Sequence, residues 1–78
     1  MTFEKFNYNW EDNFLNEPKY IRRGQSLMNY LFKVWKPEYD RITSGYYFPE
    51  ENIDCFYINS FIPNTLKHLE KVWWRYPN

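Results

Sequence analysis

The sequence predicts a mainly α-helical fold, in which three helices surround an aromatic-rich core and an N-terminal arm precedes them. Three observations support this class. Two long segments carry apolar residues at helical spacing. A short segment between them begins with proline and ends at glycine. The 78-residue chain also holds seven Phe, eight Tyr and four Trp, and each buried ring removes about 150–250 Å² from water, so few rings can build a small core.

We expect a single domain over residues 1–78, with an N-terminal arm at residues 1–15 and a helical core at residues 16–78. A chain of this length buries only about 60% of its unfolded surface, so its stability is small. A compact fold of this size has a radius of gyration of about 12 Å.

The arm carries two competing patterns. Phe6, Tyr8 and Trp10 alternate with asparagines, which is the spacing of a strand, whereas Phe3, Phe6, Trp10 and Phe14 follow a helical spacing. Asparagine is a poor strand former, so we expect a helical or irregular arm.

The second segment predicts an amphipathic helix from about Pro18 to Trp35, with Asn16 as its cap. The apolar arc contains Tyr20, Gly24, Leu27, Met28, Leu31, Val34 and Trp35, and the polar arc contains Lys19, Arg22, Arg23, Ser26, Asn29, Lys33 and Lys36. A glycine inside a helix costs about 1 kcal/mol relative to alanine. Gly24 therefore indicates the close approach of another element, such as an aromatic ring.

Two further helices are predicted after this one. Pro37 begins a short helix that Gly45 ends with a left-handed cap. The last helix runs from about Ser60 or Pro63 to Trp74 and carries a stripe of Ile62, Leu66, Leu69 and Trp73, flanked by Thr65, Val72 and Tyr76. Pro49 argues against a long strand between these helices. A short hairpin at about 46–58 is the alternative, and it would make the fold α+β.

The only cysteine, Cys55, and the only histidine, His68, are the candidates for nucleophilic chemistry. A reactive thiolate needs a base and an electropositive setting, but Asp54 adjoins the cysteine and His68 projects about 100° from the apolar stripe, near Lys71 and Arg75. One cysteine and one histidine cannot supply the ligands of a zinc site. We therefore expect no catalytic residue, no metal and no cofactor, and a buried Cys55.

The carboxylates give no recognisable acid–base pair. Glu38 and Asp40, and likewise Glu50 and Glu51, do not have the helical spacing of four residues, so we interpret them as solvated surface residues. Together with the cysteine pattern, this predicts a protein that is not an enzyme.

Aromatic and basic residues outside the apolar arcs are the candidates for binding a partner, because Trp, Tyr and Arg are enriched at interface hot spots. The candidates are Trp74, Tyr76, Tyr30, Arg22, Arg23 and Lys33. They predict a protein–protein interaction module, and self-association through the same surface is an alternative. Residues 18–36 also contain five bases and no acid, so the second hypothesis is a nucleic-acid-binding module that uses a basic helix face.

The chain carries no sign of export or of a membrane partner. The stretch "MTFEKFNYNW" lacks the apolar run of a signal peptide, and no segment approaches the ~20 apolar residues of a membrane span. A single free cysteine fits a reducing compartment. We expect a cytoplasmic protein.

The linear pattern of "RRGQSLMNYLFKVWKPEYDRITSG", followed by "DCFY" and "IPNTLKHLEKVW", resembles a group of very short uncharacterised bacteriophage and prophage proteins. The resemblance covers residues 20–74 and leaves out the N-terminal arm. The spacer "YYFPEEN" departs from the group's pattern. The resemblance implies a phage-borne accessory protein that binds and modulates or inhibits a host protein, such as a component of host defence.

Overall fold

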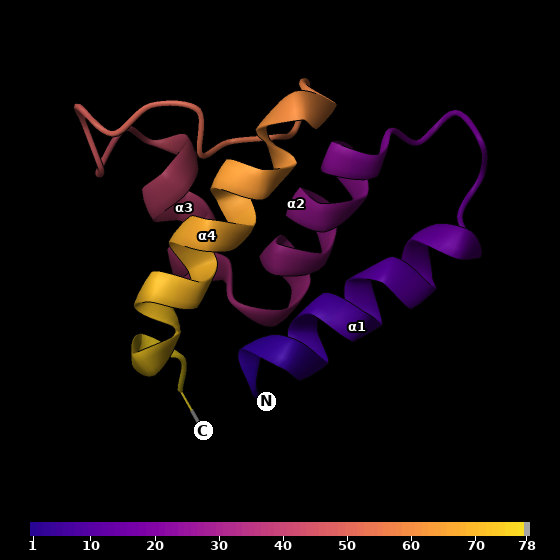
Figure 1. The fold of residues 1–78 in the computed structure, drawn as a ribbon, viewed down its shortest axis with the longest axis horizontal. Coiled ribbons are helices and arrows are strands. Elements are labelled where there is room, and N and C mark those ends of the chain that lie inside the picture. Colours follow the sequence, from indigo (N-terminus) through magenta and orange to yellow (C-terminus); the bar gives the residue numbers. More distant parts are fainter. Residues whose placement is uncertain (78) are drawn as a thin grey trace.

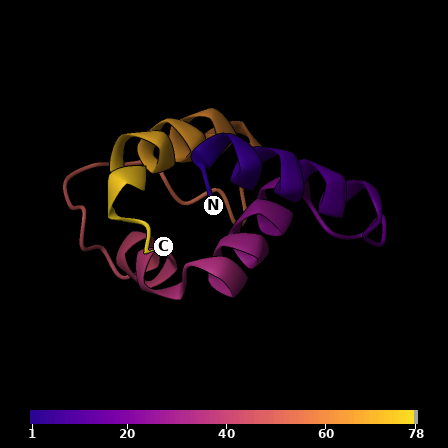
Figure 2. The same cartoon turned by 90° about the horizontal axis from the view of Figure 1, so that it is seen from below.

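The computed structural model describes residues 1–77 and folds them into four α-helices. They are α1 (Phe3–Leu15), α2 (Arg23–Val34), α3 (Lys36–Thr43) and α4 (Ile62–Val72), and the 3₁₀ turns η1 (Asn59–Phe61) and η2 (Trp73–Arg75) flank α4. Figure 1 shows α1 beside α2, and Figure 2 shows α1 and α4 on one side of the molecule with α2 and α3 on the other. The mainly α fold is confirmed. Residues 1–77 contain no strand, so the hairpin alternative is wrong.

The N-terminal segment is a helix that contributes to the core. Thr2 caps it, because its Oγ1 accepts a hydrogen bond from a backbone N–H three residues later at 3.0 Å. The helical spacing is confirmed, since Phe6 and Trp10 are fully buried and Phe3 is half-buried. This segment is therefore part of the packed fold rather than an extension from it.

The predicted start of the second helix at Pro18 is wrong, because α2 begins only at Arg23. Residues 16–22 instead reverse the chain direction, which lets α1 lie against α2 (Figure 1). Within this connection the Ile21 backbone N–H donates to the Pro18 carbonyl at 3.0 Å and closes a turn. Tyr20, which the periodicity assigns to the apolar arc, is consequently 80% exposed.

Most of the remaining apolar arc of α2 is buried as predicted, although Val34 is only half-buried. Leu27, Met28 and Leu31 are fully buried, and Trp35 at the junction with α3 is nearly so. These side chains form the middle of the core, and they fix which face of α2 points inward.

Gly24 faces the loop that precedes α4. The predicted close approach is confirmed, but it is made by backbone and not by an aromatic ring, since a Cβ at Gly24 would overlap the carbonyl oxygen of Cys55. Two hydrogen bonds hold the loop there: the Gly24 N–H donates to Asn59 Oδ1 at 2.8 Å, and Cys55 Sγ donates to the Gly24 carbonyl at 3.5 Å. Any side chain at this position would push the loop away from α2.

The short helix α3 begins and ends as the sequence predicts. Pro37 lies in its first turn, and Gly45 follows its last turn with a φ of 83°. The Tyr46 N–H donates to the Arg41 carbonyl at 3.2 Å, which is the bond that closes a Schellman cap.

The buried face of α4 is rotated from the predicted stripe. Its buried residues are Ile62, Thr65, His68, Leu69 and Val72. Leu66, a member of the predicted stripe, is only half-buried. The Thr65 hydroxyl donates to the Ile53 carbonyl at 2.7 Å inside the protein, so a polar contact with the preceding loop sets the rotation of the helix.

Trp73 in η2 is the centre of an aromatic cluster. Its ring contacts Phe3, Phe6, Trp35 and Tyr76, with ring centroids 4.8–5.8 Å apart. Its indole N–H donates to the Met1 carbonyl at 2.9 Å, so the first residue of the chain lies against the turn that follows α4. The Cα radius of gyration is 11.8 Å, as expected for a compact chain.

We expect Gly24→Ala to lower the free energy of unfolding by about 1–3 kcal/mol through overpacking against the Cys55 backbone, although alanine is the better helix former. Chemical denaturation would measure the change. Asn29→Ala, at an exposed position of the same helix, is the matched control and should be neutral or stabilising. Equal stability of Gly24→Ala and the wild type would contradict the close approach.

Candidate functional site

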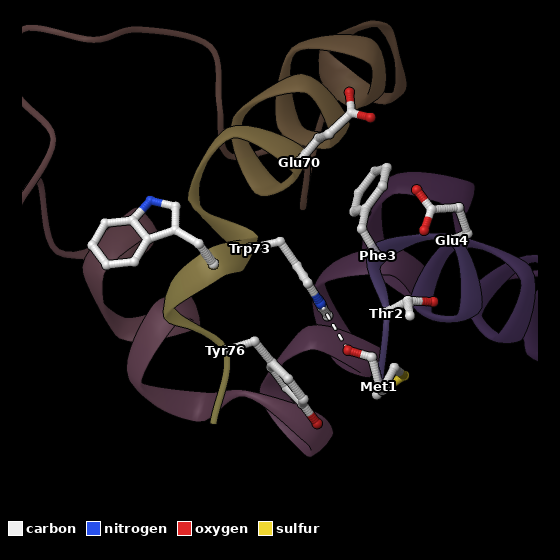
Figure 3. A pocket seen from close by; sticks show the side chains of 8 residues that line it. Met1, Thr2, Phe3, Glu4, Glu70, Trp73 and Tyr76 are labelled. Atoms are coloured by element: carbon white, nitrogen blue, oxygen red, sulfur yellow. Dashed lines mark hydrogen bonds between the residues drawn. The ribbon is translucent and has the colours of Figure 1, made fainter. Parts of the chain in front are cut away.

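A pocket of about 510 Å³ opens between the first turn of α1 and the turn η2 that follows α4 (Figure 3). It is lined by Met1, Thr2, Phe3, Glu4, Glu70, Trp73, Trp74 and Tyr76. Pockets that bind ligands typically enclose about 300–1,000 Å³. This pocket therefore has room for a side chain of a partner.

The aromatic wall of the pocket is held in place by the core. Trp73 stacks on Tyr76 with ring centroids 4.8 Å apart and meets Phe3 edge-on at 5.8 Å. Figure 3 shows the hydrogen bond from the Trp73 indole to the Met1 carbonyl as a dashed line. These groups already contact one another, so binding a ligand does not cost the conformational entropy of ordering them.

Trp74 is the exposed tryptophan at this pocket. It is 79% exposed, whereas Trp10 and Trp35 are buried. Consecutive residues of a 3₁₀ turn point about 120° apart, so Trp73 packs into the cluster while its neighbour reaches solvent. The Arg75 guanidinium lies 5.2 Å from the centroid of the Trp74 ring, which shows that this ring accepts a cation on its face.

Among the residues predicted to bind a partner, the structure brings only Trp74 and Tyr76 together at this pocket. Tyr30 is half-buried behind the aromatic wall, with its ring centroid 5.2 Å from that of Phe6. Tyr30 thus supports the core and does not line the pocket.

The predicted basic residues do not line this pocket, and their side chains do not share a contact partner. Arg22 precedes α2, where its guanidinium is 5.5 Å from the Tyr57 ring centroid. Arg23 forms an ion pair with Glu11 of α1. Lys33 is exposed in the last turn of α2.

A buried charged network, which the sequence analysis did not predict, joins α3 to α4. Glu38 is fully buried and accepts hydrogen bonds from Arg41 Nε at 2.8 Å, the Tyr47 hydroxyl at 2.6 Å and His68 Nε2 at 2.9 Å. Burial alone would raise the pKa of Glu38, but these hydrogen bonds outweigh it and lower the pKa below its usual value. The carboxylate is therefore ionised, and His68 Nε2 carries the proton.

The interpretations of Glu38 as a solvated carboxylate and of His68 as a residue on the polar side are both wrong. The spacing of these residues could have indicated that they are buried. Glu38 lies between Trp35 and Ile42 on one face of α3, and His68 shares the buried face of α4 with Val72. A polar residue at core spacing is buried when a partner on another element satisfies it. That partner is not visible from the sequence.

The other ring nitrogen of His68 faces a second pocket of about 330 Å³. This pocket is lined by Glu50, Glu51, Ile53, Asn64, Lys67, His68 and Lys71. Among residues 1–77, His68 Nδ1 has no hydrogen-bond partner, and it lies 3.7 Å from Glu50 Oε2. Both carboxylates and ammonium groups line this second pocket, so the charges of the pocket favour neither an anionic nor a cationic ligand.

Cys55 is buried, as the sequence predicts. Burial raises the pKa of its thiol, and the neighbouring Asp54 raises it further. Its hydrogen bond goes to the Gly24 carbonyl, whereas His68 bonds to Glu38. The described hydrogen bonds therefore do not join the cysteine to the histidine.

Comparison with protein-family models, curated proteins and solved structures gives no match. Within the described residues, no group of three or more His, Cys, Asp and Glu side chains is arranged to hold a metal ion. Of the helices described, none combines the length and the apolar character needed to cross a membrane.

We expect Glu38→Gln to lower the free energy of unfolding by about 3 kcal/mol at neutral pH, because it removes a charge on which a buried ion pair depends. Since the folded pKa of Glu38 is lowered, its contribution is present above the unfolded value near 4.5 and disappears as the pH falls through the folded value.

Denaturation curves at about pH 7 and about pH 3 test this dependence. The difference in stability between the two pH values should be smaller in Glu38→Gln than in the wild type. Glu51→Gln, at an exposed carboxylate, is the control and should keep the wild-type difference. An unchanged pH dependence in Glu38→Gln would show that folding does not lower the pKa of Glu38.

Proposed function

We propose that this protein is a non-enzymatic protein–protein interaction module whose contact surface is Trp74 and the pocket beside it. The observation that carries the proposal is the contrast between neighbours: Trp73 is packed in the aromatic cluster, while Trp74 is 79% exposed at the pocket. A tryptophan left in water at the edge of a formed pocket is the residue type that dominates interface energies.

The surroundings of Trp74 suit this role. The pocket wall is already ordered by ring contacts, so little conformational entropy is lost on binding. Trp74 also follows Trp73 directly in the chain. The packing of Trp73 in the aromatic cluster therefore holds the Trp74 backbone in place.

The resemblance to short phage proteins supports a particular setting for this module. In that setting the protein is encoded by a phage or prophage, acts in the host cytoplasm, and binds and inhibits a host protein such as a component of host defence. Self-association would use the same exposed aromatic surface, with a second copy as the partner.

Nucleic-acid binding through a basic helix face is the alternative. Two of the basic residues between positions 18 and 36 form ion pairs within the protein, Arg23 with Glu11 and Lys36 with Asp40. This leaves fewer free charges for phosphate contacts than the sequence suggests, and it favours the interaction module.

We expect Trp74→Ala to weaken partner binding by about 2 kcal/mol or more, which is roughly thirtyfold in Kd, without unfolding the domain. The partner would be captured from a lysate of the host by the tagged protein, identified by mass spectrometry, and then titrated in pure form. Tyr57→Ala, at an aromatic residue that is 77% exposed but does not line this pocket, is the matched control. Loss of binding in Tyr57→Ala with full binding in Trp74→Ala would place the surface elsewhere.

Capture should also survive nuclease treatment and increasing salt. Nucleic-acid binding through the basic residues instead predicts a steep fall, with a log–log slope of about one per phosphate contacted. Capture that disappears with nuclease would support the alternative and remove the aromatic surface from the interface.

A further inference from the structure

We propose that the pocket beside Trp74 takes an arginine side chain of the protein partner. This inference rests on the proposed function, because it names what that same pocket recognises. Two carboxylates, Glu4 from α1 and Glu70 from α4, line the pocket together with aromatic rings. A guanidinium suits such a lining, because it can donate to carboxylates and stack on aromatic faces at the same time.

Among residues 1–77, neither of the two carboxylates has a cation of its own. Within the described residues the ion pairs of the protein involve Glu11, Glu38, Asp40 and Glu50, and none involves Glu4 or Glu70. In the described part of the chain the Met1 amino group likewise forms no ion pair with either of them. In Figure 3 the two carboxylates are drawn on either side of the Phe3 ring. Two unpaired negative charges at one pocket favour a positively charged occupant.

The position of Glu70 does not help the fold. It lies in the last turn of α4 (Ile62–Val72), where the helix dipole presents its negative end and a carboxylate is unfavourable. Glu4 differs, because it lies in the first turn of α1, where a carboxylate stabilises the helix. Helix stability thus explains the carboxylate at Glu4 but not the carboxylate at Glu70. Binding of a cation from a partner would explain the carboxylate at Glu70.

The aromatic residues favour arginine over lysine. A planar guanidinium stacks on rings and is more weakly hydrated than an ammonium, so it loses less on entering the pocket. The protein itself places guanidinium groups over aromatic rings, for example Arg75 over the Trp74 ring at 5.2 Å and Arg22 over the Tyr57 ring at 5.5 Å. A volume of about 510 Å³ accommodates a guanidinium and its aliphatic stem.

The test is a titration of ¹⁵N-labelled protein with the peptide acetyl-Gly-Arg-Gly-amide, followed by amide chemical shifts in the NMR spectrum. The matched probe is the same peptide with citrulline, which keeps the shape of arginine and removes the charge. We expect saturable shifts at residues that line the pocket with the arginine peptide and at least a fivefold weaker response with the citrulline peptide.

Glu70→Gln is expected to weaken arginine-peptide binding about five- to tenfold, because a charge-assisted hydrogen bond becomes a neutral one. Glu51→Gln, at an exposed carboxylate outside this pocket, should bind like the wild type. The amide spectrum of each variant without peptide shows directly whether it is folded.

Three outcomes would overturn the proposal: no saturable shift, an equal response to citrulline, or wild-type affinity in a folded Glu70→Gln variant. The proposed function fails by a different result, namely partner binding that does not depend on Trp74. If Trp74-dependent binding persists while the arginine peptide fails, the interaction module stands and the arginine occupant is rejected.

Discussion

The packing of rings around Trp73 is the interaction on which the rest of the structure depends. It brings together Phe3 and Phe6 of α1, Trp35 at the junction of α2 and α3, and Tyr76 after η2. A small domain with a single cysteine has no internal disulfide to hold its elements. The aromatic cluster holds the elements together instead, because its rings bury a large apolar area and come from several elements. It also places the first turn of α1 against the end of the last helix, which creates the pocket.

A second connection between elements is polar. Glu38 of α3 bonds to His68 of α4 and to Tyr47 of the loop between them. Burying such a network costs desolvation, and it is tolerated when every charged member has a partner. Directional hydrogen bonds then determine the rotation of α4, together with the bond from Thr65 to the loop. Ring packing thus fixes the end of the last helix at η2, and hydrogen bonds fix α4 itself.

The proposed binding surface follows from the first of these connections. Because Trp73 fills the aromatic cluster, the next residue of the same turn must point elsewhere, and Trp74 is left in solvent. The rings that line the pocket are therefore part of the same packing that joins α1 to the end of α4. In the proposed function, Trp73, Phe3 and Tyr76 both line the pocket and stabilise the fold, whereas Trp74 and Glu70 would serve mainly recognition.

The sequence by itself determined the class of fold and most of its helices, because periodicity and end signals are local. The spacing of Phe3, Phe6 and Trp10 and the proline and glycine around α3 carry their structural meaning within a few residues. Gly24 on the apolar arc of α2 indicated a close approach, but only the structure shows that the Cys55 backbone makes it. The exposure of Trp74 was also predictable, since it lies off the apolar stripe of its helix.

Only the tertiary structure decided the start of α2, the rotation of α4 and the burial of Glu38 and His68. Each depends on a residue far away in the chain: α2 begins late because the chain must reverse to let α1 pack, and Glu38 is buried because His68 and Tyr47 satisfy it. The pocket likewise joins residues from the two ends of the chain. Local patterns show which side chains avoid water, but they do not show which distant groups meet them.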